Sequence, residues 1–271
     1  MIKQQFKIVE NQVVAFKTYR LVLECAPLSF RPSDSPLSFR PSDSPLSFRP
    51  SGASGEISTG EFVNLEIPGY YLRRPISICD AEGGKLTLFY KTVGAGTKAL
   101  STMPVGSEID VLTGLGRGFD ADACKNEALL VAGGLGAAPL FLLCKKLKAQ
   151  GKKVTAILGF NKADEIVLEE DFRSLCDGFA IATMDGSAGI KGLVTDAISA
   201  LQPSWDYFYT CGPMVMMRAV CSALEGPGEA SLEERMGCGA GFCYCCSIQT
   251  TGGPRRVCKD GPVFKKEDII W

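Results

Sequence analysis

The chain has 271 residues, a formal net charge of −1 and a hydrophobic content of 46%, so it is long and apolar enough for more than one domain with a buried core. Its balanced charge indicates no nucleic-acid partner. No apolar run reaches the roughly 18 to 20 residues of a bilayer span, and the amino end shows no signal-peptide pattern, so we expect a cytoplasmic protein without a membrane association. The sequence contains no histidine, which excludes Ser-His-Asp and Cys-His catalysis, histidine-ligated zinc and Rieske centres.

Residues 1–118 read as a β-rich domain. Short runs of β-branched and aromatic residues, separated by Gly and Pro, favour an antiparallel sheet or barrel of about six strands that ends near Gly116. One helix is expected within it, at residues 96–103. The six expected strands lie at 6–15, 19–26, 61–69, 75–81, 85–93 and 107–114.

A nine-residue repeat interrupts this domain. The unit LSFRPSDSP occurs twice in full from residue 28 and begins a third time at residue 46. Fewer than three full copies cannot stack into a solenoid core, the prolines remove ladder donors, and Arg and Asp nearly cancel. We expect residues 28–54 to form a mobile surface insertion rather than a binding element.

Residues 119–228 alternate between buried strands and helices. Strands are expected at 127–134, 153–160, 179–186 and 206–212, and helices at 138–151, 168–176, 193–201 and 213–224. This alternation predicts right-handed crossovers and a parallel sheet covered on both faces. Ligands of such sheets bind at the carboxyl ends of the strands.

Two glycine turns follow strands of this sheet and predict a nucleotide site. In "GGLGAAP" a proline stands where the usual fingerprint has its third glycine, but proline is tolerated in a first helical turn; an ordinary strand–helix connection is the alternative. Asp164 and Glu165 would accept ribose hydroxyls and repel a 2′-phosphate, which favours NAD over NADP, or they form a solvated acidic loop. The turn residues are Gly133, Gly134, Gly136, Cys211, Gly212 and Pro213.

Five of the twelve cysteines crowd into residues 238–258, within a small module expected at 229–271. The spacing Cys238-x4-Cys243-x2-Cys246, followed by Cys258, is typical of a plant-type 2Fe-2S cluster. The small residues beside these cysteines would let backbone amides reach the sulfurs. A four-cysteine zinc site is the alternative, although such sites favour two CxxC knuckles. Cys245 is surplus to this pattern, and the other seven cysteines are expected to be mostly packing residues.

The motifs "RRPISI", "VGAGT", "GGLGAAP" and "CGPMVMM", in this order, resemble the ferredoxin-reductase superfamily. The resemblance implies an FAD site in the β-rich domain, with Arg74 near the phosphates and Ser77 near the isoalloxazine. It also implies that Gly96 and Thr97 bind the pyrophosphate with backbone amides. The FAD residues that it implies are Arg74, Pro75, Ile76, Ser77, Phe89, Tyr90, Lys91, Gly96 and Thr97.

With the cysteine segment after the nucleotide domain, nearly the whole chain resembles the family of electron-transfer subunits of two-subunit, NAD-linked dihydroorotate dehydrogenases. The resemblance implies an FMN-containing catalytic partner subunit, a heterotetramer, and electron flow from dihydroorotate through FMN, 2Fe-2S and FAD to NAD+ in pyrimidine (UMP) biosynthesis. The catalytic oxidation of dihydroorotate would belong to the partner, because no residues here form a substrate site. The nine-residue repeat and Cys245 depart from the family pattern.

Two alternatives remain open on the sequence. One is a flavin/iron–sulfur subunit of another oxidoreductase, of the sulfide dehydrogenase or transhydrogenase type. The other is a zinc-stapled binding protein on a reductase scaffold. We also hypothesise that Phe242 and Tyr244, two aromatic residues in a glycine-rich loop, are exposed beside the cysteines and contact the partner.

Overall fold

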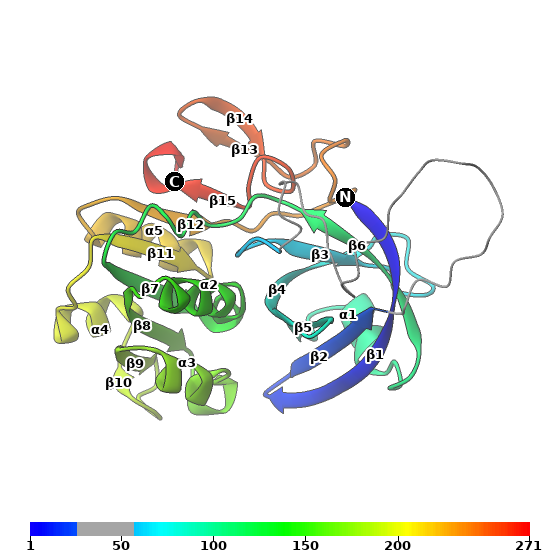
Figure 1. The fold of residues 1–271 in the computed structure, drawn as a ribbon, viewed down its shortest axis with the longest axis horizontal. Helices are drawn as coiled ribbons and strands as arrows, with labels where there is room; N and C mark the ends of the chain where they lie inside the picture. Colours follow the sequence, from blue (N-terminus) through cyan, green and yellow to red (C-terminus); the bar gives the residue numbers. More distant parts are fainter. Residues whose placement is uncertain (26–56) are drawn as a thin grey trace.

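The computed structural model describes residues 1–25 and 57–271. The insertion expected at 28–54 lies outside the described residues. The described chain forms a β-barrel, an α/β layer beside it, and a small cysteine-rich region that touches both (Figure 1).

Six antiparallel strands close the barrel in the order β1-β2-β5-β4-β3-β6. This confirms the predicted six-stranded architecture, and the last strand ends one residue before Gly116. Inward positions alternate with outward ones, so that Phe6, Ile8, Leu21 and Leu23 have no exposed surface. The elements are β1 (Ile2–Ala15), β2 (Thr18–Cys25), β3 (Phe62–Leu65), β4 (Arg74–Glu82), β5 (Lys85–Lys91), α1 (Ala95–Ser101) and β6 (Glu108–Leu115).

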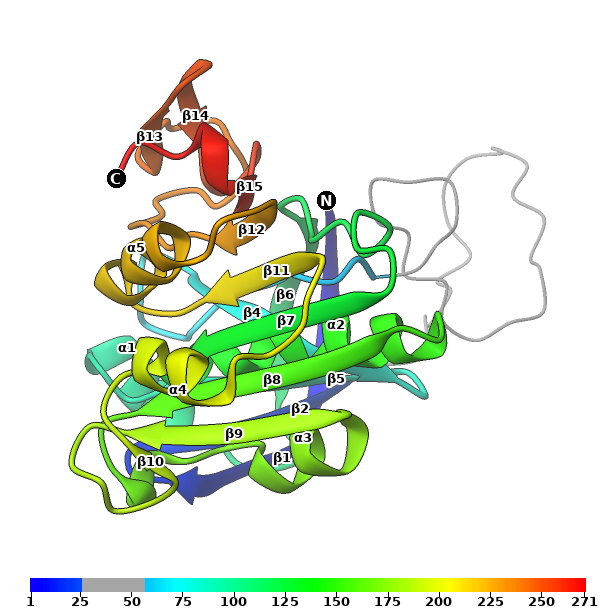
Figure 2. The ribbon, with the colours of Figure 1, turned by 90° about the vertical axis from the view of Figure 1, so that its left-hand side faces the viewer.

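The α/β layer is built on a seven-stranded sheet in the order β10-β9-β8-β7-β11-β12-β15 (Figure 2). Neighbouring strands pair in parallel except β15, which runs antiparallel to β12. The strands are β7 (Glu127–Gly133), β8 (Lys153–Phe160), β9 (Gly178–Thr183), β10 (Ile190–Lys191), β11 (Tyr207–Cys211), β12 (Gly228–Ser231) and β15 (Val263–Lys265).

Helices cover both faces of this sheet, as predicted. α2 (Ala137–Ala149) and α3 (Glu169–Leu175) pack on the face toward the barrel, and α4 (Val194–Leu201) and α5 (Met214–Ala223) pack on the other face (Figures 1 and 2). β7 and β11 are buried along almost their whole length, which explains their continuous apolar sequence.

Two short strands, β12 and β15, attach the cysteine-containing segment between them to the sheet. β12 and β15 extend the sheet, and the segment between them carries the cysteines and a small ribbon of β13 (Ser247–Thr250) and β14 (Gly253–Arg256). The sequence did not predict these strands, because they are three or four residues long and show no strand periodicity. Their position follows from pairing with β11 and with each other.

The barrel and the α/β layer are in direct contact. Lys145 of α2 binds Asp80 and Glu82 of β4 at 3.0 and 2.9 Å. The β1–β2 hairpin reaches the loop after β8, where the Phe16 amide donates to the Asp164 carbonyl at 2.8 Å. Over residues 1–25 and 57–271, no helix is both long and apolar enough to cross a bilayer.

Candidate functional site

Two of the motifs that suggested an FAD site meet at the amino end of α1. Arg74, at the start of β4, lies directly over Gly96: a Cβ on that glycine would be 2.4 Å from the Arg74 Nε atom. The Arg74 guanidinium donates to the Leu72 carbonyl and stacks on Tyr70 at 5.4 Å. Thr97 caps the turn, since its hydroxyl accepts from the Val93 amide at 3.1 Å. A guanidinium and a buried glycine therefore adjoin at one helix end, an arrangement suited to an anionic group.

The other expected flavin residues point in different directions. Along β5, Phe89 and Lys91 face the α/β layer, whereas Tyr90 points into the barrel, stacks on Tyr19 at 5.3 Å and donates its hydroxyl proton to Asn11 at 2.8 Å. Only the backbone of Tyr90 is therefore available to a ligand. Pro75, Ile76 and Ser77 follow Arg74 on β4 and are half-buried.

A cavity of about 790 Å³ lies at the carboxyl ends of the sheet strands. The turns after β7 and β11 both line it, so the structure brings together the two turns that the sequence suggested separately. Cys211 is buried behind the lining, and burial raises the pKa of its thiol to about 12. The predicted residues that line the cavity are Lys91, Gly133, Gly134, Gly136, Gly212 and Pro213.

The two turns interlock through their glycines. A Cβ on Gly136 would be 2.1 Å from the Cys211 carbonyl oxygen, and a Cβ on Gly212 would be 2.8 Å from the Gly133 nitrogen. Gly212 also has a φ of +148°. Only glycine fits at these two positions, and their close packing leaves backbone amides at the cavity wall, where a pyrophosphate could bind.

Glu165 lines the same cavity and pairs with Lys91 at 3.3 Å across the boundary between the two layers. Asp164 is exposed and does not line the cavity. Several other lining residues were missed by the analysis of the sequence; their only signal was a place just after a strand. They include Asn161, Met184, Leu193, Thr195, Val215 and Glu233.

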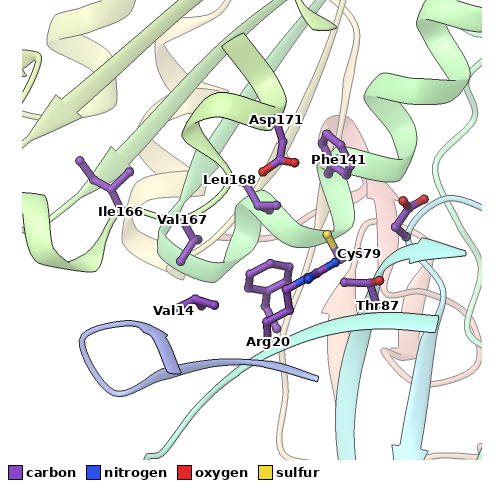
Figure 3. A pocket seen from close by; sticks show the side chains of 11 residues that line it. Val14, Arg20, Cys79, Thr87, Phe141, Ile166, Val167, Leu168 and Asp171 are labelled. Carbon is purple, nitrogen blue, oxygen red and sulfur yellow. The ribbon is translucent and has the colours of Figure 1, made fainter. Parts of the chain in front are cut away.

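A second cavity, of about 410 Å³, opens between the barrel and helices α2 and α3 (Figure 3). Arg20 of β2 and Asp171 of α3 point into it from opposite sides, and the buried thiol of Cys79 lies beside the guanidinium. Phe89 lines this cavity rather than the larger one. Phe89 and Lys91, two residues apart on β5, therefore line different cavities.

The four expected ligand cysteines lie in one region as two pairs. The Cys238 and Cys243 side chains interact with each other, as do those of Cys246 and Cys258. Cys246 and Cys258 are buried at 1% and 2% exposure in the core that also contains Phe62 of the barrel. A two-iron cluster takes two thiolates on each iron, so two adjacent pairs suit it. Across the described ranges, no three potential ligands surround a single ion position.

Backbone amides point at these sulfurs. The amides of Ala240 and Phe242 donate to the Cys238 sulfur at 3.4 and 3.3 Å, and those of Cys238 and Cys258 donate to the sulfurs of Cys243 and Cys246, each at 3.4 Å. Burial acts to raise the pKa of Cys238, but hydrogen bonds from the Ala240, Cys243 and Phe242 amides and from the Cys243 side chain outweigh it and lower that pKa to about 6. Such donors stabilise the thiolate that an iron ion requires. The residues present fit an iron–sulfur cluster.

Most of the seven scattered cysteines are buried, as expected for packing residues, whereas Cys245 is not. Cys245 is exposed and takes part in neither pair. The sulfurs of Cys144 and Cys176 are 3.4 Å apart between α2 and the end of α3. The scattered thiols that are buried are Cys79, Cys124, Cys144, Cys211 and Cys221.

The loop between Cys238 and Cys246 presents aromatic side chains to solvent. Phe242 is 76% exposed and Tyr244 is 65% exposed, which confirms their expected exposure. Tyr244 has a φ of +58°, a conformation that costs energy for a bulky residue. The Arg256 guanidinium holds its ring at 4.8 Å. Two large exposed rings therefore lie beside the cysteines.

Comparisons with known proteins agree with this architecture. Residues 233–270 match the model of the iron-sulfur cluster binding domain of dihydroorotate dehydrogenase B. The chain is 42% identical, over 78% of its length and 86% of the relative, to the electron transfer subunits of dihydroorotate dehydrogenase B (NAD(+)) from Fusobacterium nucleatum and Bacillus cereus. A solved NADH-dependent reduced ferredoxin-NADP oxidoreductase superposes with a TM-score of 0.80 at 28% identity, covering 98% of this chain and 90% of that one.

The barrel, the parallel sheet with its glycine turns and the paired cysteines define an oxidoreductase subunit with a ferredoxin-reductase-like fold and an iron–sulfur binding domain. The superposition on the solved structure covers 98% of this chain, and the family model covers the cysteine region. The chain belongs to the family of electron transfer subunits of NAD+-dependent dihydroorotate dehydrogenase B.

Proposed function

We propose that this chain carries electrons between an FMN-containing dihydroorotate dehydrogenase catalytic subunit and NAD+, using one 2Fe-2S cluster and one FAD, within a heterotetramer of two subunits of each kind. Bound FAD supplies the exchange between hydride transfer and single-electron transfer. The observation that carries the proposal is the arrangement of four cysteines in two pairs, with backbone amides directed at their sulfurs.

The cysteine region supports a relay because of where it packs. Cys246 and Cys258 share a buried core with Phe62 of the barrel and with Phe264 of the sheet. A cluster held by Cys238, Cys243, Cys246 and Cys258 would therefore adjoin the flavin domain on one side. Cys243 is exposed, so the other side would face solvent or a partner.

For the flavin, we assign the phosphates to Arg74 together with the amides of Gly96 and Thr97. The guanidinium offers a fork of donors in a fixed plane, which suits a diphosphate better than a lysine does. Ser77 lies three residues further along β4, within the same strand, and we assign its hydroxyl to the isoalloxazine. Lys91 and the backbone of Tyr90 would border the ring.

For NAD, we assign the pyrophosphate to the interlocked turns at Gly134, Gly136 and Gly212. Glu165 lines this cavity with its carboxylate held by Lys91 at 3.3 Å. A carboxylate there accepts ribose hydroxyls and repels a 2′-phosphate, which supports NAD over NADP.

We assign the partner contact to the loop that carries Phe242 and Tyr244. Aromatic residues are enriched at the centres of protein interfaces, and the Tyr244 ring is already held by the Arg256 guanidinium at 4.8 Å. Their position between Cys238 and Cys246 would bring a partner close to the cluster.

One experiment tests the proposal. The protein, purified without oxygen, is analysed for iron, acid-labile sulfide, zinc and FAD, and is then reduced with NADH or NADPH while flavin absorbance and electron paramagnetic resonance are followed. We expect two irons and one FAD per chain, flavin bleaching with NADH, and a rhombic signal from the cluster. Zinc in place of iron would contradict the proposal.

A transhydrogenase-type subunit is the second candidate, because the solved structure with a TM-score of 0.80 is an NADH-dependent reduced ferredoxin-NADP oxidoreductase. Adding the catalytic subunit and dihydroorotate separates the two. Under our proposal NAD+ is reduced only when both are present, whereas NADPH-driven ferredoxin reduction by this subunit would favour the alternative.

A further inference from the structure

A single buried amide side chain connects the barrel to the cysteine loop. Asn64 lies on β3, where it is 1% exposed. In the strand register it stands opposite Pro75 of β4, within the turn to which we assign the flavin, and opposite Leu112 of β6 on the other side. Its backbone is thus held by pairing on both sides in a closed barrel.

The side chain of Asn64 reaches out of this rigid strand to the first ligand cysteine. Its Nδ2 atom donates to the Cys238 carbonyl at 3.4 Å. It also packs against the next residue, since a Cβ on Gly239 would be 2.4 Å from that Nδ2 atom. Gly239 has a φ of +65°, so the loop turns sharply at this contact.

This contact joins the barrel directly to residues 237–246 through a side-chain hydrogen bond. The loop itself contains no helix or strand before Ser247. The Asn64 Oδ1 atom is buried without a hydrogen-bond partner in the structure. Burying an unsatisfied amide oxygen is unfavourable for stability, so a purely structural role would favour an apolar residue here.

Arg73 fixes the strand from the other side. Its guanidinium donates to the Asn64 carbonyl at 3.3 Å and to the Asp110 carbonyl at 3.2 Å, and it pairs with the carboxylates of Glu66 and Asp110. Arg73 immediately precedes Arg74. The segment Arg73-Arg74 therefore contributes both to the proposed flavin turn, through Arg74, and to the position of Asn64, through Arg73.

We infer that Asn64 is a positioning residue that fixes the cysteine loop against the flavin turn, and so sets both the rate of electron exchange between the two cofactors and the surroundings of the Cys238 sulfur. The inference rests on the proposed function. Cluster potentials depend on hydrogen bonds to the sulfurs and on solvent exposure. The Ala240 and Phe242 amides that donate to the Cys238 sulfur follow Gly239, the residue against which Asn64 packs, by one and three positions. Loss of such outer contacts commonly lowers metal affinity or activity about 10- to 100-fold.

The test compares Asn64→Leu, which keeps the branched shape but removes the amide, with Asn64→Ser, which is smaller and makes no steric demand on the loop. Thr113→Val is the matched control: Thr113 is also a buried polar residue of the barrel, 5% exposed on β6, and its hydroxyl bonds the Ile2 carbonyl away from the loop. NADH is mixed with each protein without oxygen, and flavin bleaching and cluster reduction are timed separately.

We expect both Asn64 variants to bleach their flavin at the unchanged rate, to reduce the cluster about tenfold more slowly, and to show a shifted midpoint potential in a titration followed by electron paramagnetic resonance. Loss of iron from these variants with FAD retained would also support the inference. Cluster reduction and potential equal to those of Thr113→Val would overturn it.

A second measurement does not depend on the cofactors working. Amide hydrogen exchange in the peptide spanning 237–246 should be faster in Asn64→Ser than in the unchanged protein, while barrel peptides exchange equally. Unchanged exchange in that peptide would overturn the inference. Failure of the proposed function would be visible in the unchanged protein, as absent iron or no reduction by NADH.

Discussion

The Cys211 carbonyl occupies the space where Gly136 would carry a side chain, 2.1 Å from the position of its Cβ. This contact joins the turn after β7 to the turn after β11, and it closes the wall of the larger cavity. We expect Gly136→Ala to push the turns apart, destabilise the fold by about 1–3 kcal/mol and weaken NADH binding. Calorimetry and denaturant unfolding measure the two effects. Gly252→Ala is the control, because a Cβ there makes only ordinary contacts of 3.8 and 3.9 Å; equal behaviour of the two variants would contradict the assignment.

Replacing ligand cysteines should distinguish Cys245 from its neighbours. Cys246→Ser and Cys258→Ser remove buried sulfurs, so we expect loss of iron and acid-labile sulfide from both. Cys245 is exposed and outside both pairs, so Cys245→Ser should keep the full iron content and the same spectrum. Iron and sulfide analysis with visible absorption checks this. A Cys245→Ser protein without iron would show that the ligand set is wrong.

Glu229 should make stability depend on pH. It is 6% exposed on β12 and accepts the Asp120 amide at 3.0 Å, and burial raises its pKa from 4.5 to about 7. The folded state therefore binds this proton more tightly than the unfolded state. The stabilising contribution is complete below about pH 4.5 and is lost as pH rises through about 7.

Glu229→Gln keeps an acceptor for the Asp120 amide and removes the charge. We expect the variant to be more stable than the unchanged protein above about pH 7, by up to about 3 kcal/mol, and to lose this advantage near pH 4.5. Denaturant unfolding at several pH values measures the difference. Glu234→Gln makes the same charge change at an exposed position; a similar pH profile for both would rule out burial as the cause.

Arg74 should govern FAD retention. Its guanidinium lies over Gly96, and a charge-assisted bond to a phosphate contributes about 1.5–3 kcal/mol. We expect Arg74→Ala to weaken FAD binding about 10- to 100-fold, and Arg74→Lys to restore it only in part because lysine cannot form the planar fork. Flavin fluorescence on titration of apoprotein gives the dissociation constant. Unchanged binding in both variants would place the phosphates elsewhere.

The exposed aromatic pair should be needed for assembly. We expect Phe242→Ser with Tyr244→Ser to weaken binding of the catalytic subunit by at least about tenfold, without loss of iron. Size-exclusion chromatography and analytical ultracentrifugation report the complex. Val13→Ser is a control at another exposed apolar residue, 63% exposed on the β1–β2 hairpin; assembly that survives the double change would remove this loop from the interface.

Elements whose sequence shows a strand or helix period could be predicted, whereas the short strands β12 to β15 could not. The barrel strands and the alternating strands and helices of the sheet each carry enough apolar residues to show a period. β12 and β15 are four and three residues long, and they become strands because neighbouring strands offer them partners. Local pattern carries no information about such pairing.

The parts of the candidate site that depend on residue type and spacing could be predicted from the sequence. The cysteines and the glycine turns are of that kind, and the structure brings each set together. The direction of the Tyr90 side chain was not used in the prediction, which placed Tyr90 at the flavin. Leu86, Leu88 and Tyr90 alternate along β5 and share the barrel core, so this alternation indicates that the Tyr90 ring points into the barrel. Asn64 gave no signal, because the cysteine loop that it contacts is remote in the sequence.

Glu233 lines the larger cavity, to which we assign the nucleotide, and Cys238 follows it by five residues along an irregular stretch of backbone. The wall of the cavity and the first proposed cluster ligand thus lie on one short segment of the chain. A dinucleotide bound as we propose would therefore lie five residues along the chain from the first proposed cluster ligand, and the shortest covalent route between the two sites would not pass through the barrel.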